Sequence, residues 1–234
     1  MTEWLLDLSK IILVNIVLSG DNAVVIALAC RNLSPEVQKK AVFWGSFGAI
    51  GLRVILTFVA VWLLKVPLVE TLGGLLLVWI AVKLLAGEEE GDNVSGSSSI
   101  REAIKTIIIA DLVMSLDNVV AVAGAAKGDI TLILVGLAVS IPLIIWGSQL
   151  LMKIMQRFPI IVILGAALLG YTAGEMIMGD AIVGTYIEHV WNGFEVGFPI
   201  GMAVLVIIIG KWLASRHNKQ DVGDSDIAGL RENT

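Results

Sequence analysis

The sequence predicts an all-α, polytopic membrane protein with about seven transmembrane helices, on three observations. Of its 234 residues, 57% are hydrophobic and only 16% are charged, whereas about a quarter of the residues of a soluble domain are charged. The mean hydropathy is +0.89, and the apolar residues gather in runs of about 20, the length of helix that crosses a hydrocarbon core roughly 30 Å thick. Finally, part of the first half of the chain recurs in the second half.

The apolar runs define the expected spans, and Gly or Pro within them is compatible with a membrane helix. These spans cover residues 8–30, 41–64, 68–86, 103–126, 130–151, 160–178 and 196–214. The expected organisation is a first three-helix repeat (1–86), a flexible cytoplasmic linker (87–100), a second three-helix repeat (101–178), an outer loop (179–195), a seventh helix (196–214) and a disordered polar tail (215–234).

The outer loop has a helical pattern of its own. Ile187, Val190, Trp191 and Phe194 follow one another at i, i+3, i+4 and i+7. This spacing suits a short helix lying in the outer membrane interface, and it suits equally well an ordinary connecting helix packed on the bundle. Both interpretations stay open on the sequence.

The distribution of Lys and Arg predicts the orientation. If the N-terminus lies outside, the outer segments contain only Lys65 and Lys127, besides Lys10 near the start of the first helix. The inner segments then contain Arg31, Lys39, Lys40, Lys83, Arg101, Lys105, Lys153, Arg157, Lys211, Arg216 and Lys219. Because basic residues favour the cytoplasmic side, we expect the N-terminus outside and the C-terminus inside.

Several classes of protein are disfavoured. The net charge of −5 and the pI near 5.0 leave no basic surface for nucleic acid. The single cysteine, Cys30, excludes an internal disulfide and a Cys-based zinc site. The sequence contains no GxxxxGK[ST] motif for ATP hydrolysis, and it has SGDN and SLDN in place of the GxGD of intramembrane aspartyl proteases. We therefore expect neither an enzyme nor a prosthetic group.

The internal repeat is clearest at its polar residues. The run IILVNIVLSGDNAVVIALA at residues 11–29 overlays IIIADLVMSLDNVVAVAGA at 107–125 after a shift of 96 residues. Polar residues are rare within membrane helices, so their matches carry more weight than matches of Leu or Val. The polar pairs are Asn15 with Asp111, Ser19 with Ser115, Asp21 with Asp117, and Asn22 with Asn118.

Three helices per repeat place the second repeat upside down relative to the first. A second match supports this length, because Pro67 and Pro159 are each followed by a Leu-Gly pair and an apolar run. Inverted repeats of this kind are typical of secondary transporters, whose sites lie where the repeats meet near the midplane. The sequence therefore predicts two inverted three-helix repeats plus a final helix.

The candidate site draws on four acidic residues within the expected spans. Asp21, Asp111 and Asp117 lie near mid-depth, and Glu175 lies nearer the outer end of the sixth span. A bare carboxylate at the bilayer centre costs on the order of 3 kcal/mol, and the obvious basic partner is Arg53 in the second span. Since acid exceeds base, either some carboxyl groups are protonated or a cation neutralises them.

The residues around these acids are hard oxygen ligands, which suit Mg²⁺, Ca²⁺ and Mn²⁺ rather than Zn²⁺, Cu⁺ or Ni²⁺. The candidate metal ligands are Asn15, Ser19, Asp21, Asn22, Asp111, Ser115, Asp117 and Asn118. The alternative is that these groups simply join helices by hydrogen bonds. Arg53 is either a counter-ion of Asp111 or Glu175, or a gate that repels the cation on release.

The stretches LSGDNAVVIALA at 18–29 and DLVMSLDNVVAVAG at 111–124 resemble the TerC family of integral membrane proteins, in its compact bacterial branch. The resemblance covers about residues 5–214 and matches the family motif at Asp21, Asn22, Asp117 and Asn118. It implies a seven-helix protein of the LysE-type transporter superfamily, in the bacterial cytoplasmic membrane, that exports manganese. It also implies a supply of Mn²⁺ to secreted metalloenzymes beside the secretion machinery.

Three functions stay open on this basis. The first is export of Mn²⁺ by secondary transport, with protons as the coupling ion. The second is a membrane scaffold that assists assembly or metalation of secreted proteins and transports nothing. The third is export of another small cation, Ca²⁺ or Mg²⁺, or of an amino acid. The expected partners are the lipid bilayer, the divalent cation, protons, and either a second copy of the chain or the secretion machinery.

Overall fold

The computed structural model describes Ser9, Leu13 and residues 20–63, 66–87, 96–125, 130–190 and 194–231. Within these ranges the chain forms helices and short connections, and it contains no strand. The predicted all-α class is therefore confirmed. Asn15 and Ser19 lie outside the described residues.

The helices follow the predicted spans closely where Pro or Gly marks an end. Gly87 ends one helix in the left-handed region at φ 74°, and its N–H donates to the Lys83 carbonyl; Pro159 directly precedes another helix. The helices are α2 (Gly20–Cys30), α3 (Pro35–Leu63), α4 (Val69–Ala86), α5 (Gly96–Ala125), α6 (Ile130–Arg157), α7 (Ile160–Gly179), α8 (Val183–Val190) and α9 (Gly197–Arg231).

Five helices in the described part of the chain are long and apolar enough to cross a membrane. They cover Pro35–Val59, Val69–Ala86, Leu134–Arg157, Ile160–Gly179 and Gly197–Arg216. The other two predicted spans correspond to α5 and to α2, a shorter apolar helix that is described over 11 residues. The chain is therefore a multi-pass membrane protein.

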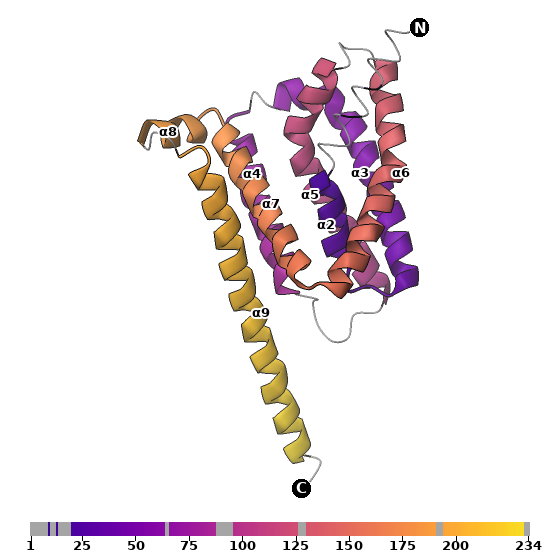
Figure 1. Ribbon diagram of the computed structural model, residues 1–234, viewed down its shortest axis with the longest axis vertical. Helices are drawn as coiled ribbons and strands as arrows, with labels where there is room; N and C mark the ends of the chain where they lie inside the picture. The colour runs from indigo at the N-terminus through magenta and orange to yellow at the C-terminus, as the bar shows by residue number, and fades with distance from the viewer. Residues whose placement is uncertain are drawn as a thin grey trace.

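The helices pack in two groups (Figure 1). One group consists of α4, α7 and α9, and the other of α2, α3, α5 and α6. Within its group, the short α2 lies on the side that meets the other group, since it contacts both α6 and α7. Nearly all of its side chains are buried, and Cys30 at its end has no exposed surface. The polar residues of α2 are thus held in the interior of the molecule.

Small residues let α7 approach α9 closely. A Cβ atom on Gly174 would lie 2.5 Å from the Cα atom of Pro199, and one on Gly170 would lie 2.9 Å from the Cα atom of Ala203. Glycines four residues apart are a common means of close packing between membrane helices. The contact therefore depends on the absence of a side chain at both positions.

The two ends of the bundle differ in the elements they present (Figure 1). The α2–α3 and α6–α7 connections lie at one end, and α8 lies at the other. The predicted outer loop does contain a helix, α8. Beyond the end that holds the α2–α3 connection, α9 continues to Arg231, whereas the sequence predicted a disordered tail from residue 215. No proline follows Pro199, so no residue type in this segment interrupts the helical hydrogen bonds.

Candidate metal-binding site

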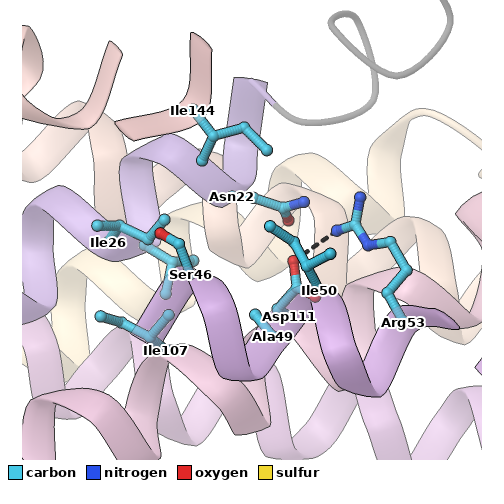
Figure 2. Close-up of a pocket in the computed structure, with 10 residues that line it drawn as sticks. Asn22, Ile26, Ser46, Ala49, Ile50, Arg53, Ile107, Asp111 and Ile144 are labelled. Atoms are coloured by element: carbon cyan, nitrogen blue, oxygen red, sulfur yellow. Dashed lines mark hydrogen bonds and ion pairs between the residues drawn. The ribbon is translucent and has the colours of Figure 1, made fainter. Parts of the chain in front are cut away.

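A small cavity lined mostly by buried residues lies where α2, α3 and α5 meet, with Ile144 of α6 along one side (Figure 2). It offers about 20 Å³ to the centre of a water-sized sphere, which is room for roughly one water molecule. Six of its ten lining residues are aliphatic. The four polar lining residues are Asn22, Ser46, Arg53 and Asp111, and the rest of the wall is apolar.

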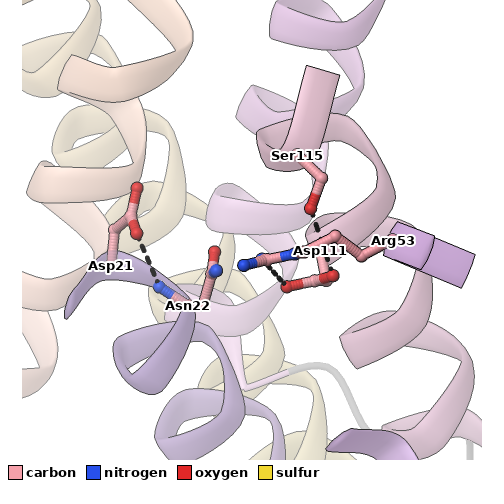
Figure 3. Close-up of polar contacts among 5 residues, drawn as sticks. All are labelled: Asp21, Asn22, Arg53, Asp111 and Ser115. Atoms are coloured by element: carbon pink, nitrogen blue, oxygen red, sulfur yellow. Dashed lines mark hydrogen bonds and ion pairs between the residues drawn. The ribbon is translucent and has the colours of Figure 1, made fainter. Parts of the chain in front are cut away.

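An ion pair dominates the cavity. The Nη2 atom of Arg53 on α3 donates to Oδ1 of Asp111 on α5 at 2.5 Å, and the Ser115 hydroxyl, one turn along α5, donates to Oδ2 of Asp111 at 3.2 Å (Figure 3). Arg53 is 5% exposed and Asp111 9%. The helices α3 and α5 pack against each other, so the Arg53 side chain of α3 reaches the Asp111 carboxylate of α5 directly.

Two further polar residues at the cavity, and the guanidinium of the ion pair itself, have atoms without a partner. Both amide atoms of Asn22, the Ser46 hydroxyl and the Nε atom of Arg53 are buried and make no hydrogen bond. Asn22 is 3% exposed and Ser46 2%. Buried polar atoms nearly always form hydrogen bonds with protein, water or a ligand. The grouping of these unpartnered atoms around one cavity therefore indicates that the cavity binds a water molecule or an ion.

Asp21 lies beside this group at the start of α2. Its Oδ1 atom accepts a hydrogen bond from the backbone N–H of Asn22 at 2.8 Å, and its side chain is half-buried. In Figure 3 the Asn22 side chain lies between the Asp21 carboxylate and the Arg53 guanidinium. The ion pair of Arg53 is with Asp111, while the hydrogen bond to Asp21 comes from the Asn22 backbone.

The structure brings together several of the predicted site residues, namely Asn22, Asp111, Ser115 and Arg53, with Asp21 adjacent. Asp117 and Asn118 lie in α5, where Asn118 is half-buried and the side chain of Asp117 lies outside the described residues. Glu175 lies on α7 with an exposed side chain. Of the two counter-ions considered for Arg53, the one it contacts is Asp111.

Sequence reasoning missed Ser46. The signal was present, because Ser46 and Arg53 are seven residues apart and therefore lie on the same face of a helix. Ala49 and Ile50, at the intermediate i+3 and i+4 positions, also line the cavity. A lone serine in an apolar span is easily taken for packing, but its spacing from a buried arginine identifies the face that meets α2 and α5.

In the part of the chain that the structure describes, no three His, Cys, Asp or Glu residues lie close enough together to hold a metal ion. A cation at this place would therefore be held by a mixed set of carboxylate, amide and hydroxyl oxygens. Such sets are usual for Mg²⁺ and similar hard ions, which use one or two carboxylates and keep several waters.

The fold and the buried charges define a multi-pass helical membrane protein with an ionised site in its interior. A sequence model of the integral membrane protein TerC family matches residues 1–218. The chain belongs to the TerC family.

Individual relatives agree with this assignment. The chain is 43% identical to the uncharacterized membrane protein YjbE of Bacillus subtilis over 88% of this chain and 94% of YjbE. It is 27% identical to YceF of the same organism over 68% of this chain and 65% of YceF, and 26% identical to the inner membrane protein YgdQ of Escherichia coli K12 over 89% and 94%. No solved structure matches the chain.

Proposed function

We propose that this protein is a secondary transporter that exports a divalent metal cation, with Mn²⁺ as the favoured substrate, through a site between α2 and α5. The observation that carries the proposal is the Asn22 amide. Both of its polar atoms are buried without a partner beside the paired charges of Arg53 and Asp111. An amide left unsatisfied inside a membrane protein costs several kcal/mol, and a bound cation or its water would satisfy it.

The ligand chemistry supports a hard divalent ion. The polar side chains around the cavity offer oxygen from Asn22, Ser46 and Asp111, with Asp21 next to them. The equivalent residues of the second repeat in the sequence are Asp117 and Asn118 of α5, which are oxygen ligands of the same kind. Oxygen ligands of this kind suit Mn²⁺, Mg²⁺ and Ca²⁺.

The packing of the helices supports two inverted repeats. Suppose that α2, α3 and α4 form one repeat and that α5, α6 and α7 are their respective counterparts in the other. The symmetry then requires that a contact of α3 with α5 be matched by a contact of α6 with α2. Both contacts are present, and α4 packs on its own counterpart, α7. The axis that relates the repeats then passes between α2 and α5, which is where transporters of this kind bind their substrates.

Protons are the coupling ion in this proposal. The sequence has three acidic residues in the apolar helices α2 and α5, namely Asp21, Asp111 and Asp117, and Arg53 compensates Asp111. The two remaining negative charges match either one divalent cation or two protons. Exchange of one for the other would keep the interior neutral, which avoids the large cost of an uncompensated charge at this depth.

The test is a flux measurement on purified protein in liposomes that enclose a Mn²⁺-sensitive dye. We expect the wild type to move Mn²⁺ and Asp21→Asn to lower the rate about tenfold or more, as the loss of a metal-site group commonly does. Glu36→Gln is the matched control, because Glu36 is an exposed acid in the first turn of α3, and it should keep the wild-type rate. If wild-type liposomes move neither Mn²⁺, Mg²⁺ nor Ca²⁺, the transporter is ruled out and the scaffold remains.

A further inference from the structure

The position of the Arg53 guanidinium coincides with the place where oxygen ligands from α2 and α5 converge. Asn22 approaches from α2, Asp111 from α5, and in Figure 3 the guanidinium lies between them; Figure 2 shows all three at the same cavity. Arg53 itself comes from α3 and is bonded to Asp111 through Nη2. A positive group that belongs to the protein therefore already occupies the centre of the candidate cation site.

The guanidinium fits this place incompletely. Its Nε atom has no hydrogen-bond partner, although guanidinium nitrogens normally donate wherever they are buried. The Asn22 amide and the Ser46 hydroxyl, at the same cavity, are also unpartnered. The arrangement satisfies the charge of Asp111 but leaves the Asn22 carbonyl oxygen and the Ser46 hydroxyl oxygen unused, and these are the atoms that a different cation could use.

Charge decides which ion can compete with Arg53. At equal distance, a carboxylate attracts a divalent ion twice as strongly as it attracts a guanidinium or Na⁺. The guanidinium is also tethered beside Asp111, so its effective concentration there is high. A monovalent ion therefore gains nothing by displacing Arg53, whereas a divalent ion gains the attraction of its second charge.

We propose that Arg53 is the resident cation of this site, and that it restricts entry to divalent ions because an entering metal must take Asp111 from it. This inference rests on the proposed function and adds to it a residue that determines specificity. Asp111 then alternates between two positive partners, Arg53 in the metal-free protein and the metal in the loaded protein.

The experiment is calorimetric titration of the purified full-length protein with MnCl₂ in two buffers of equal ionic strength, one of NaCl and one of choline chloride. Equal ionic strength keeps the screening the same, and choline is too large for the cavity. For the wild type, we expect the same Mn²⁺ affinity in both buffers. For Arg53→Gln, we expect Na⁺ to weaken the apparent Mn²⁺ affinity by about tenfold relative to choline, within the usual range of coupling between two ligands.

Arg53→Lys is the matched control, because it keeps the positive charge on a long side chain. It should bind Mn²⁺ equally well in Na⁺ and in choline, as the wild type does. If Arg53→Gln does not fold in choline chloride, its folding is compared in NaCl and in MnCl₂, because a cation that enters the site would restore the charge partner of Asp111. Recovery of the fold in either salt is then the expected result.

The two proposals fail separately. If the wild type neither binds nor moves Mn²⁺, the proposed transport is wrong. If the wild type binds and moves Mn²⁺, but Arg53→Gln is as indifferent to Na⁺ as the wild type, or is recovered by neither salt, the transport proposal stands and the role of Arg53 is overturned. Sensitivity of Arg53→Lys equal to that of Arg53→Gln would also overturn it, because charge would then not be the cause.

Discussion

At the scale of single residues, the pair of Arg53 and Asp111 is the most consequential feature of the interior. Each side chain is almost fully buried, and each supplies the charge that the other requires. Removing one partner of a buried pair leaves an uncompensated charge and costs about 3–5 kcal/mol, whereas removing both costs far less. The pair therefore links stability to the chemistry of the site.

This pair gives a prediction that does not depend on any metal. Asp111→Asn and Arg53→Gln should each lower the free energy of unfolding by about 3–5 kcal/mol. The double variant should lose much less than the sum of the two single losses, because neither charge is then unpaired. Denaturant unfolding in detergent, followed by tryptophan fluorescence, measures all three values. Simple additivity would show that the two side chains do not interact.

The carboxylate of Asp180, just after α7, accepts hydrogen bonds from three backbone N–H groups. Its Oδ1 atom accepts hydrogen bonds from the N–H groups of Ile182 and Val183 at the start of α8, and its Oδ2 atom accepts one from Thr71 in the first turn of α4. Burial alone would raise the pKa of this carboxyl group, but the N–H donors outweigh burial and hold the pKa below its ordinary value. The ionised form is thus the one that stabilises the turn.

Asp180→Ala should therefore destabilise the protein by about 0.5–2 kcal/mol at neutral pH, the usual cost of losing such a cap. Because the folded-state pKa is lowered, this stabilisation is present above the unfolded-state pKa near 4. It disappears as the pH falls through the lower, folded-state pKa. Thermal unfolding at pH 7 and near pH 3 measures the difference between wild type and variant at each pH. A difference that stays constant with pH would contradict the ionised cap.

At the scale of helices, the close contact of α7 with α9 is sensitive to a single methyl group. In Gly174→Ala the new Cβ atom would meet the backbone of Pro199 at 2.5 Å, which the two helices can relieve only by moving apart. We expect a loss of about 1–3 kcal/mol, typical of overpacking. Gly201→Ala is the control, since nothing lies within 4 Å of its Cβ position. The two melting temperatures in detergent make the comparison, and equal values would disprove the constraint.

The helix boundaries show what hydropathy can and cannot predict. The helices α4 and α7 agree with the predicted spans 68–86 and 160–178 within one residue, because Pro and Gly mark their ends. By contrast, α3 begins at Pro35, six residues before the predicted start at residue 41. The turn PEVQKK is helical but polar, so a pattern that detects only apolar length does not include it.

The candidate site was predictable as a set of residues but not as a set of contacts. The repeat and the rarity of charge in apolar runs identified Asp21, Asn22, Asp111 and Arg53 from the sequence. Which acid Arg53 would meet depends on how α3 is rotated against α5, and that rotation is determined by packing rather than by the helix's own sequence. The contribution of Ser46 follows from the same rotation.

At the scale of the whole molecule, basic and aromatic residues together mark one end of the bundle. Lys83 lies 5.7 Å from the ring centre of Trp79, Arg157 lies 5.8 Å from that of Phe158, and Arg216 lies 3.8 Å from that of Trp212. The first two of these pairs lie at or near the C-terminal ends of α4 and α6, and the third follows the apolar part of α9. Such combinations are typical of a membrane interface, and basic residues favour the cytoplasmic one.

We therefore expect this end to face the cytoplasm and α8 to face outward. A membrane-impermeant maleimide added to intact cells should label Tyr186→Cys, on the exposed surface of α8, and should leave Asn32→Cys, in the α2–α3 connection, unlabelled. Permeabilising the cells should expose Asn32→Cys. The reverse pattern would mean that the bundle is inserted the other way up.

The burial of Cys30 makes the native protein a ready background for thiol chemistry. Cys30 is the only cysteine in the sequence, and it has no exposed surface. Thiol reagents in water therefore do not reach it while the protein is folded. Spin labels, fluorophores or cross-linkers can be attached at chosen positions without first engineering the natural thiol away. Any signal from Cys30 itself would then report that the bundle has opened.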